Sequence, residues 1–127
     1  MRNVVLLLLG LAIGAIATAN ILTALRQRDV YPRGLMNVMQ HHLAGLREDL
    51  RHNRCGGSTV ENLSLLRAIS PGIGPAVYAG DTPDAPFREY EKRLQDALAA
   101  TPATCAELAP VVEKISAACE ACHRQYR

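Results

Sequence analysis

The last segment of the chain, residues 104–127, has the sequence TCAELAPVVEKISAACEACHRQYR. Apolar side chains recur along it at steps of three and four residues, which places them on one face of a helix that packs against a core. Thr104 and Glu107 have the spacing of a capping box, in which both side chains bond to free backbone N–H groups at the start of a helix. Pro110 falls inside the pattern and predicts either a kink or a later start. The inward-facing residues of this predicted helix are Leu108, Val111, Val112, Ile115 and Ala118.

A second strong helical pattern covers residues 31–51. Its apolar stripe predicts a face buried in the core, and the charged Arg47 falls largely off this stripe. Pro32 suits the first turn of a helix, where its missing N–H is not needed, so we expect the helix to begin there. Two glycines, Gly56 and Gly57, favour its end. The stripe consists of Met36, Met39, Leu43, Leu46 and Leu50.

Two shorter patterns predict two further helices, over about residues 58–69 and 87–100. Ser58 and Glu61 have the spacing of a capping box at the start of the first of these helices. The prolines and glycines of residues 71–75 are expected to weaken or break that helix, and the loop through Asp81, Pro83 and Pro86 is expected to be irregular. The second helix has its apolar face at Phe87, Tyr90, Leu94 and Leu98.

The composition agrees with an all-helical fold. Aromatic residues make up 4% of the 127 residues and tryptophan is absent, whereas strands favour aromatic and β-branched residues. Four helices with short links pack most simply as an antiparallel up-down-up-down four-helix bundle, and the length suits one domain. We therefore predict an all-α four-helix domain over residues 20–127. The formal net charge of +2, without a basic block, argues against a nucleic-acid partner.

The N-terminal segment differs from the rest of the chain. Residues 4–25 carry no charged side chain, and the small residues at positions 17–19 match the site that a signal peptidase cleaves. We expect residues 1–19 to be a secretory signal peptide. The alternative is an uncleaved membrane anchor over residues 1–28, since such an uncharged stretch can span a bilayer, although the arginines after it oppose the positive-inside bias. Both alternatives place the remaining chain in the periplasm.

A short motif near the C-terminus carries the chemistry. The pentapeptide CEACH, residues 119–123, matches the C-x-x-C-H pattern of covalent haem attachment. On a helix its two thiols and its imidazole project from one side. Cys119 and Cys122 can then form thioethers with one porphyrin, and His123 can bind the iron as the proximal axial ligand. A redox-active dithiol would instead be expected at the start of a helix, where the dipole lowers the thiol pKa.

This motif, followed by RQYR at residues 124–127 and closing a four-helix chain, resembles the cytochromes c′ and their low-spin relatives, the class II c-type cytochromes. The resemblance implies one covalent haem c, with Arg127 near the proximal imidazole. In this family a tyrosine lies five residues before the side chain that covers the sixth coordination site, and Tyr31 and Met36 reproduce this interval. A methionine there is typical of the low-spin members, in which it binds the iron. The family's arginine near a haem propionate directly follows the tyrosine, whereas here a proline intervenes and Arg33 is the candidate.

The sixth coordination site decides between two functions. Met36 as the distal ligand predicts a one-electron carrier, since a thioether is a usual partner of histidine in electron-transfer haems. An open site predicts instead a five-coordinate protein that binds nitric oxide or carbon monoxide. Met39, one turn further along, is the second candidate ligand. His41 and His42 are expected at the surface or at the edge of the haem pocket, although either one would complete a zinc site with the motif, which gives a haem-free interaction module as a third hypothesis.

Two other cysteines, Cys55 and Cys105, fall in the first and third connections between the predicted helices. In an up-down-up-down bundle these connections lie at the same end, and an exported protein can form disulfides. A disulfide between them would close a loop of about 50 residues, worth ~4 kcal/mol in the chain-entropy model. Two unpaired thiols are the alternative.

The expected partners follow from these hypotheses. We expect redox proteins as partners, with diatomic gases and a membrane contact through residues 4–25 as alternatives. The resemblance adds a homodimer, because family members often pair through their first two helices. No set of acid, base and nucleophile accompanies the haem motif, so no catalysis is expected.

Overall fold

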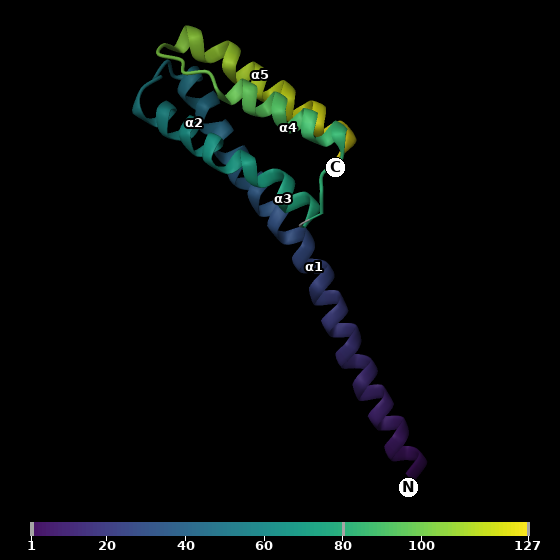
Figure 1. The fold of residues 1–127 in the computed structure, drawn as a ribbon. Helices are drawn as coiled ribbons and strands as arrows, with labels where there is room; N and C mark the ends of the chain where they lie inside the picture. The colour runs from purple at the N-terminus through teal and green to yellow at the C-terminus, as the bar shows by residue number, and fades with distance from the viewer. Residues whose placement is uncertain (1, 80, 127) are drawn as a thin grey trace.

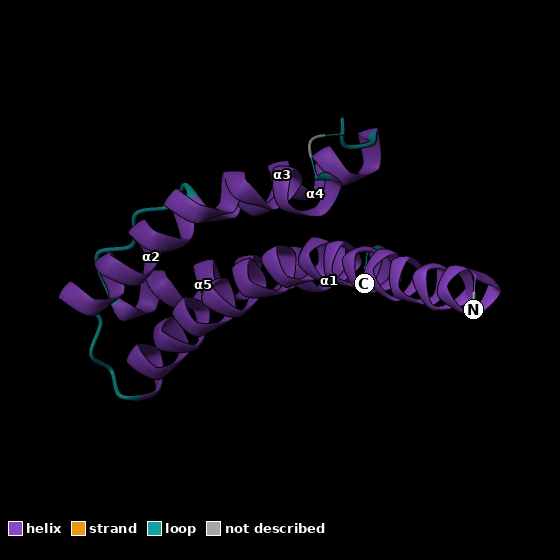
Figure 2. Cartoon of the chain, turned by 90° about the horizontal axis from the view of Figure 1, so that it is seen from below, coloured by secondary structure: helices purple, strands orange, loops and turns teal. Residues whose placement is uncertain are grey.

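Every regular element of the computed structural model is a helix, which confirms the predicted all-α class. The structure describes residues 2–79 and 81–126, without the side chains of Arg2 and of residues 24–29, and these residues contain no strand (Figure 2). In chain order the elements are α1 (Arg2–Arg51), α2 (Gly57–Ile69), the 3₁₀ turn η1 (Ser70–Gly72), α3 (Ile73–Tyr78), α4 (Ala85–Leu98) and α5 (Cys105–Gln125).

Helix α1 is much longer than predicted. It runs unbroken over 50 residues, and Pro32 lies inside it instead of in its first turn. A proline removes one backbone hydrogen bond, but good helix formers such as Leu, Arg and Met flank this one, so the helix continues through it. The first half of α1 extends away from the other helices, which surround only its second half (Figure 1).

The extended half of α1 is apolar and uncovered. Residues Asn3–Thr23 form a stretch with a mean hydropathy of 2.4, and none of it is buried inside the protein. Its length and composition suffice to cross a membrane, and an N-terminal signal sequence would have the same properties. The described structure therefore agrees with either a signal sequence or an anchor.

The core lies where the second half of α1 meets the other helices. Helix α1 packs on α2, α3 and α5, and α4 packs on α5 and α2 (Figure 1). The predicted apolar stripes of the long helices face this core, as expected from their helical spacing. The largest fully buried side chains are Leu46, Leu66, Phe87, Leu98, Leu108 and Ile115.

The start of α2 differs from the prediction. Gly56 precedes the helix without a side-chain cap, and the Ser58 hydroxyl donates to the Asp49 carboxylate instead of capping α2. Thr59 also donates to Asp49, over 2.9 Å. Asp49 is only 8% exposed, and a buried carboxylate must find donors. The capping box with Glu61 is therefore wrong, because the hydroxyl satisfies a buried charge on α1.

Residues 70–78, which include the segment expected to weaken or break the second helix, are helical. The turn η1 and helix α3 occupy residues 70–78, with Pro71 in the first positions of η1 and Pro75 in the first turn of α3. A proline at these positions loses no intrahelical hydrogen bond, so both prolines are compatible with helix. Ala79 then takes a left-handed conformation (φ 49°) and ends α3.

The start of α5 largely follows the prediction. Thr104 accepts a hydrogen bond from the backbone N–H of Glu107, as a cap does. The Glu107 carboxylate reaches back to the N–H of Ala103, one residue before the expected partner. Pro110 lies inside the helix, so the later start considered from the sequence is wrong. A single proline near the start, between alanine and valines, does not stop this helix.

Cys55 and Cys105 are paired as a disulfide. Their Cα atoms are 5.3 Å apart, which is within the usual range for a disulfide. Cys55 lies between α1 and α2, and Cys105 is the first residue of α5. The structure thus confirms the predicted pair, which joins the α1–α2 connection to the start of the last helix.

Candidate functional site

A cavity of about 360 Å³ lies between α1, α4 and α5, with α2 and α3 closing one wall. This volume is within the range of small-molecule and cofactor sites. Most of its wall is apolar, with the polar groups gathered at a few positions. The apolar wall consists of Met36, Met39, Leu43, Leu66, Ile73, Leu94, Ile115 and Ala118.

The three chemical groups of the CEACH motif lie on this cavity. Cys119, Cys122 and His123 all line it, from the last two turns of α5. Both thiols are free and half-buried, and the His123 side chain is exposed. Helical spacing of three and four residues places them on one side of α5, as predicted.

The electrostatic environment keeps both thiols protonated. Burial raises the pKa of the Cys119 thiol, the neighbouring Cys122 adds to the rise, and the guanidinium of Arg47 opposes it. Burial also raises the pKa of Cys122, with a smaller contribution from the Glu91 carboxylate. A redox-active dithiol needs a lowered thiol pKa, so these two cysteines lack the activation that such chemistry requires.

Both candidate methionines face the same cavity. Met36 is partly buried and Met39 is 6% exposed, and each lines the wall that α1 contributes. The thioethers therefore share one cavity with the thiols and the imidazole of α5. This juxtaposition joins two segments that are at least 80 residues apart in the sequence.

The other predicted site residues lie elsewhere. Arg33 is exposed on α1, outside the described residues that line the cavity, and Arg127 is outside the described part of the chain. His41 is exposed, and Nδ1 of His42 is hydrogen-bonded to Oδ1 of Asn62 at 2.9 Å. Neither His41 nor His42 is among the described residues that line the cavity. Within the described residues, no group of three or more His, Cys, Asp or Glu side chains is arranged to hold a metal ion directly.

Two charged residues that α1 and α4 contribute to the cavity wall were not predicted. Arg47, expected off the apolar stripe, lines the cavity and donates a hydrogen bond to the Ser116 hydroxyl over 2.8 Å. Its position eleven residues after Met36, three helical turns, was the available signal. Glu91 also lines the cavity, and its carboxylate accepts a hydrogen bond of 2.7 Å from the backbone N–H of Gly74. No sequence pattern pairs Glu91 with Gly74, because their contact depends on how α3 packs against α4.

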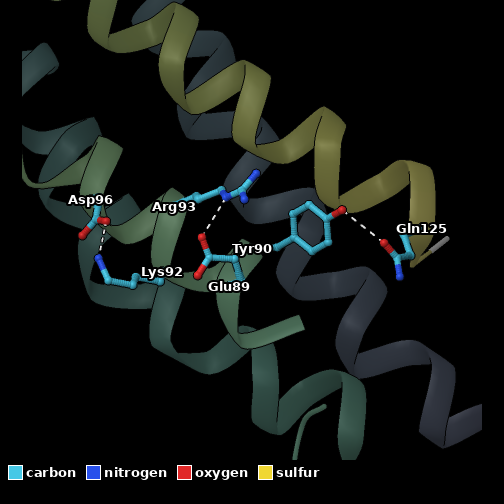
Figure 3. A network of polar contacts seen from close by, with 6 residues as sticks. All are labelled: Glu89, Tyr90, Lys92, Arg93, Asp96 and Gln125. Atoms are coloured by element: carbon cyan, nitrogen blue, oxygen red, sulfur yellow. Dashed lines mark hydrogen bonds and ion pairs between the residues drawn. The ribbon is translucent and has the colours of Figure 1, made fainter. Parts of the chain in front are cut away.

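Polar contacts of α4 connect the cavity wall to the end of α5. Tyr90 lines the cavity, and its hydroxyl donates to Oε1 of Gln125 over 3.1 Å (Figure 3). On the exposed side of the same helix, Arg93 pairs with Glu89 and its guanidinium lies 5.7 Å from the centre of the Tyr90 ring. These contacts hold Tyr90 between the charged surface of α4 and the last turn of α5.

Asp84 holds Tyr126, the residue that directly follows α5. Its carboxylate accepts hydrogen bonds from the hydroxyls of Tyr126 (2.7 Å) and Tyr78 (3.0 Å) and from the N–H of Phe87 (2.7 Å). The Phe87 and Tyr126 rings are 5.1 Å apart, edge to face. The hydrogen bond from the Phe87 N–H, followed by that from Tyr126, lowers the pKa of Asp84. Burial and the bond to Asp84 raise the pKa of Tyr126 to about 12.

Comparison with known proteins adds no relative. No protein-family model, no curated protein and no solved structure matches the chain. The functional argument therefore rests on the geometry of the cavity and on the chemistry of the CEACH motif.

Proposed function

We propose that this chain is an exported c-type cytochrome with one covalent haem c, which carries single electrons with His123 and Met36 as axial ligands. The observation that carries the proposal is the shared cavity: the two thiols, the imidazole and the Met36 thioether all line it. A thioether–imidazole pair is the usual ligand set of electron-transfer haems, and it favours a high reduction potential.

The residues around the cavity fit such a group. Free thiols at positions 119 and 122 supply two attachment points three residues apart on one helix. When bound, haem supplies a reversible one-electron couple at its iron. The apolar wall from α1, α2, α3 and α4 excludes water, and Tyr90, bonded to Gln125, braces the turn that carries His123.

The proposal includes the antiparallel up-down-up-down four-helix bundle of the cytochrome c′ family as the arrangement of α1, α2–α3, α4 and α5. Contacts of α1 with α2 and of α4 with α5 support it. The Cys55–Cys105 disulfide supports it as well, because it joins the α1–α2 connection to the start of α5, and these share one end in such a bundle. A disulfide and an N-terminal apolar helix also agree with a periplasmic location.

The experiment is an absorption spectrum of the purified protein, made with a haem-maturation system, with and without dithionite and carbon monoxide. We expect low-spin bands in both oxidation states and little reaction with carbon monoxide. Met36→Leu, nearly isosteric, should give a high-spin ferrous haem that binds carbon monoxide, whereas the matched control Met39→Leu should keep the low-spin bands. A wild-type ferrous haem that is high-spin and binds the gas would contradict the carrier and favour the gas-binding alternative. A colourless protein, without haem stain after denaturing electrophoresis, would end the proposal.

A further inference from the structure

The hydroxyl groups in the N-terminal half of α1 are paired within the helix. The hydroxyls of Thr18 and Thr23 each donate to the backbone carbonyl four residues earlier, in Gly14 and Ala19, over 2.8 Å. These are the only hydroxyl side chains between Asn3 and Thr23, and every backbone group there is in helix. In the apolar interior of a bilayer, polar groups must be paired within the segment. The two hydroxyls and the helical backbone meet this requirement, and the remaining polar side chains, Asn3 and Asn20, lie near the two ends of the segment.

The dimensions also match a bilayer. A helix rises 1.5 Å per residue, so Asn3–Thr23 measures about 32 Å, against roughly 30 Å for the hydrocarbon core. None of its apolar surface is buried by the rest of the protein. The predicted cleavage site at residues 17–19 lies within continuous helix, whereas proteolytic nicking favours exposed loop tips.

Because α1 continues without a break from this segment into the core, it fixes which end of the helical domain faces the membrane. Met36 follows Thr23 by thirteen residues, which is about 20 Å along the helix, while Arg51 lies about 42 Å from Thr23. The C-terminal end of α5 lies at the end where α1 leaves the other helices (Figure 1). The CEACH motif is therefore on the membrane-facing side and the disulfide on the far side.

We infer that residues 1–19 are retained, that α1 anchors the protein in the membrane, and that the electron-transfer partner is an integral protein of the same membrane. This inference rests on the proposed haem function. A rigid helix holds the cavity about 20 Å above the bilayer, too far for a quinol inside the hydrocarbon core, but within reach of the extramembrane part of a neighbouring membrane protein. A soluble partner is disfavoured because the candidate site faces the membrane.

The first test is the intact mass of the full-length protein extracted from the membrane fraction. We expect a chain that keeps residues 1–19 and carries the mass of one haem. A chain beginning at Asn20 with haem would overturn the anchor and leave the proposed function intact. A full-length chain without haem would overturn the proposed function, while its mass would still show that residues 1–19 are retained.

The second test measures the rate at which native membranes reduce the haem. Inserting seven helix-forming residues after Thr23 raises the cavity by about 10 Å on a rigid spacer, whereas seven Gly and Ser residues add flexible reach. We expect the helical insertion to slow reduction by about tenfold or more, because a rigid spacer that misses the span removes the benefit of tethering. The flexible insertion should stay close to wild type. Equal reduction rates for the two insertions would overturn the inference of a membrane partner. So would a soluble form of residues 20–127 that is reduced as fast as wild type at the same concentration.

Discussion

Removing the Cys55–Cys105 disulfide should destabilise the protein by about 4 kcal/mol. The two cysteines are 50 residues apart in sequence. In the chain-entropy model a cross-link of this length removes about 14 cal/mol/K from the unfolded chain, which is about 4 kcal/mol at 25 °C. Small domains have only ~5–15 kcal/mol of stability in total, so the loss should be large and easily measured. The effect acts on the unfolded state, and we expect the α1–α2 connection to keep its place in the folded protein.

The assay is urea unfolding followed by circular dichroism, comparing wild type with the double variant Cys55→Ser and Cys105→Ser. Replacing both residues avoids a lone reactive thiol. The variant should unfold at a lower urea concentration, with a slightly larger dependence on urea because its unfolded chain is more expanded. Reductant should move wild type toward the variant and leave the variant unchanged. A difference below about 1 kcal/mol, or the same shift with reductant in both proteins, would refute the reasoning.

Three further results are expected. Asp49→Ala should lower the free energy of unfolding in urea by about 1–3 kcal/mol, because it leaves the buried hydroxyl of Thr59 on α2 without an acceptor. Stability should fall between pH 10 and about 12, because this tyrosine ionises in the unfolded chain before Tyr126 ionises in the folded protein, and Tyr126→Phe should flatten this loss. Stability should also fall below pH 3.8, because Asp84, whose pKa is lowered in the folded protein, becomes protonated there. The double variant Cys119→Ser and Cys122→Ser should lose covalent haem stain and melt at a lower temperature than wild type.

Helical spacing predicted most residues of the core, but Ile73 is buried in the segment that was expected to break the second helix. Met39, Leu43 and Leu46 on α1 are buried as their spacing of three and four residues indicates, and the predicted face of α5 is buried too. The helix ends were predicted less well. Ser58 has the right spacing for a cap, but spacing alone does not reveal that the buried Asp49 lies within reach of its hydroxyl. Local patterns are overridden wherever a distant buried charge competes for the same donor.

The candidate site was predictable in its chemistry and not in its surroundings. The thiols and the imidazole belong to one short motif, so their common face follows from helix geometry alone. Arg47 and Glu91 reach the cavity from other helices, and their contacts with Ser116 and Gly74 depend on how those helices pack. The family resemblance pointed to Arg33 for the same region, yet the described wall of the cavity lacks it.

The cavity and the core share their walls, which links the proposed cofactor to folding. Met39, Leu43 and Leu94 belong to the buried core and also line the cavity. An enclosed core cavity costs about 24 cal/mol per Å³, and this cavity of about 360 Å³ is partly open to solvent at exposed side chains such as His123, so it costs only part of that rate. Even a fraction of that cost is large beside the stability of a small domain. A rigid apolar group held at Cys119 and Cys122 would fill this space, so the same turn of α5 that supplies the chemistry would also complete the core.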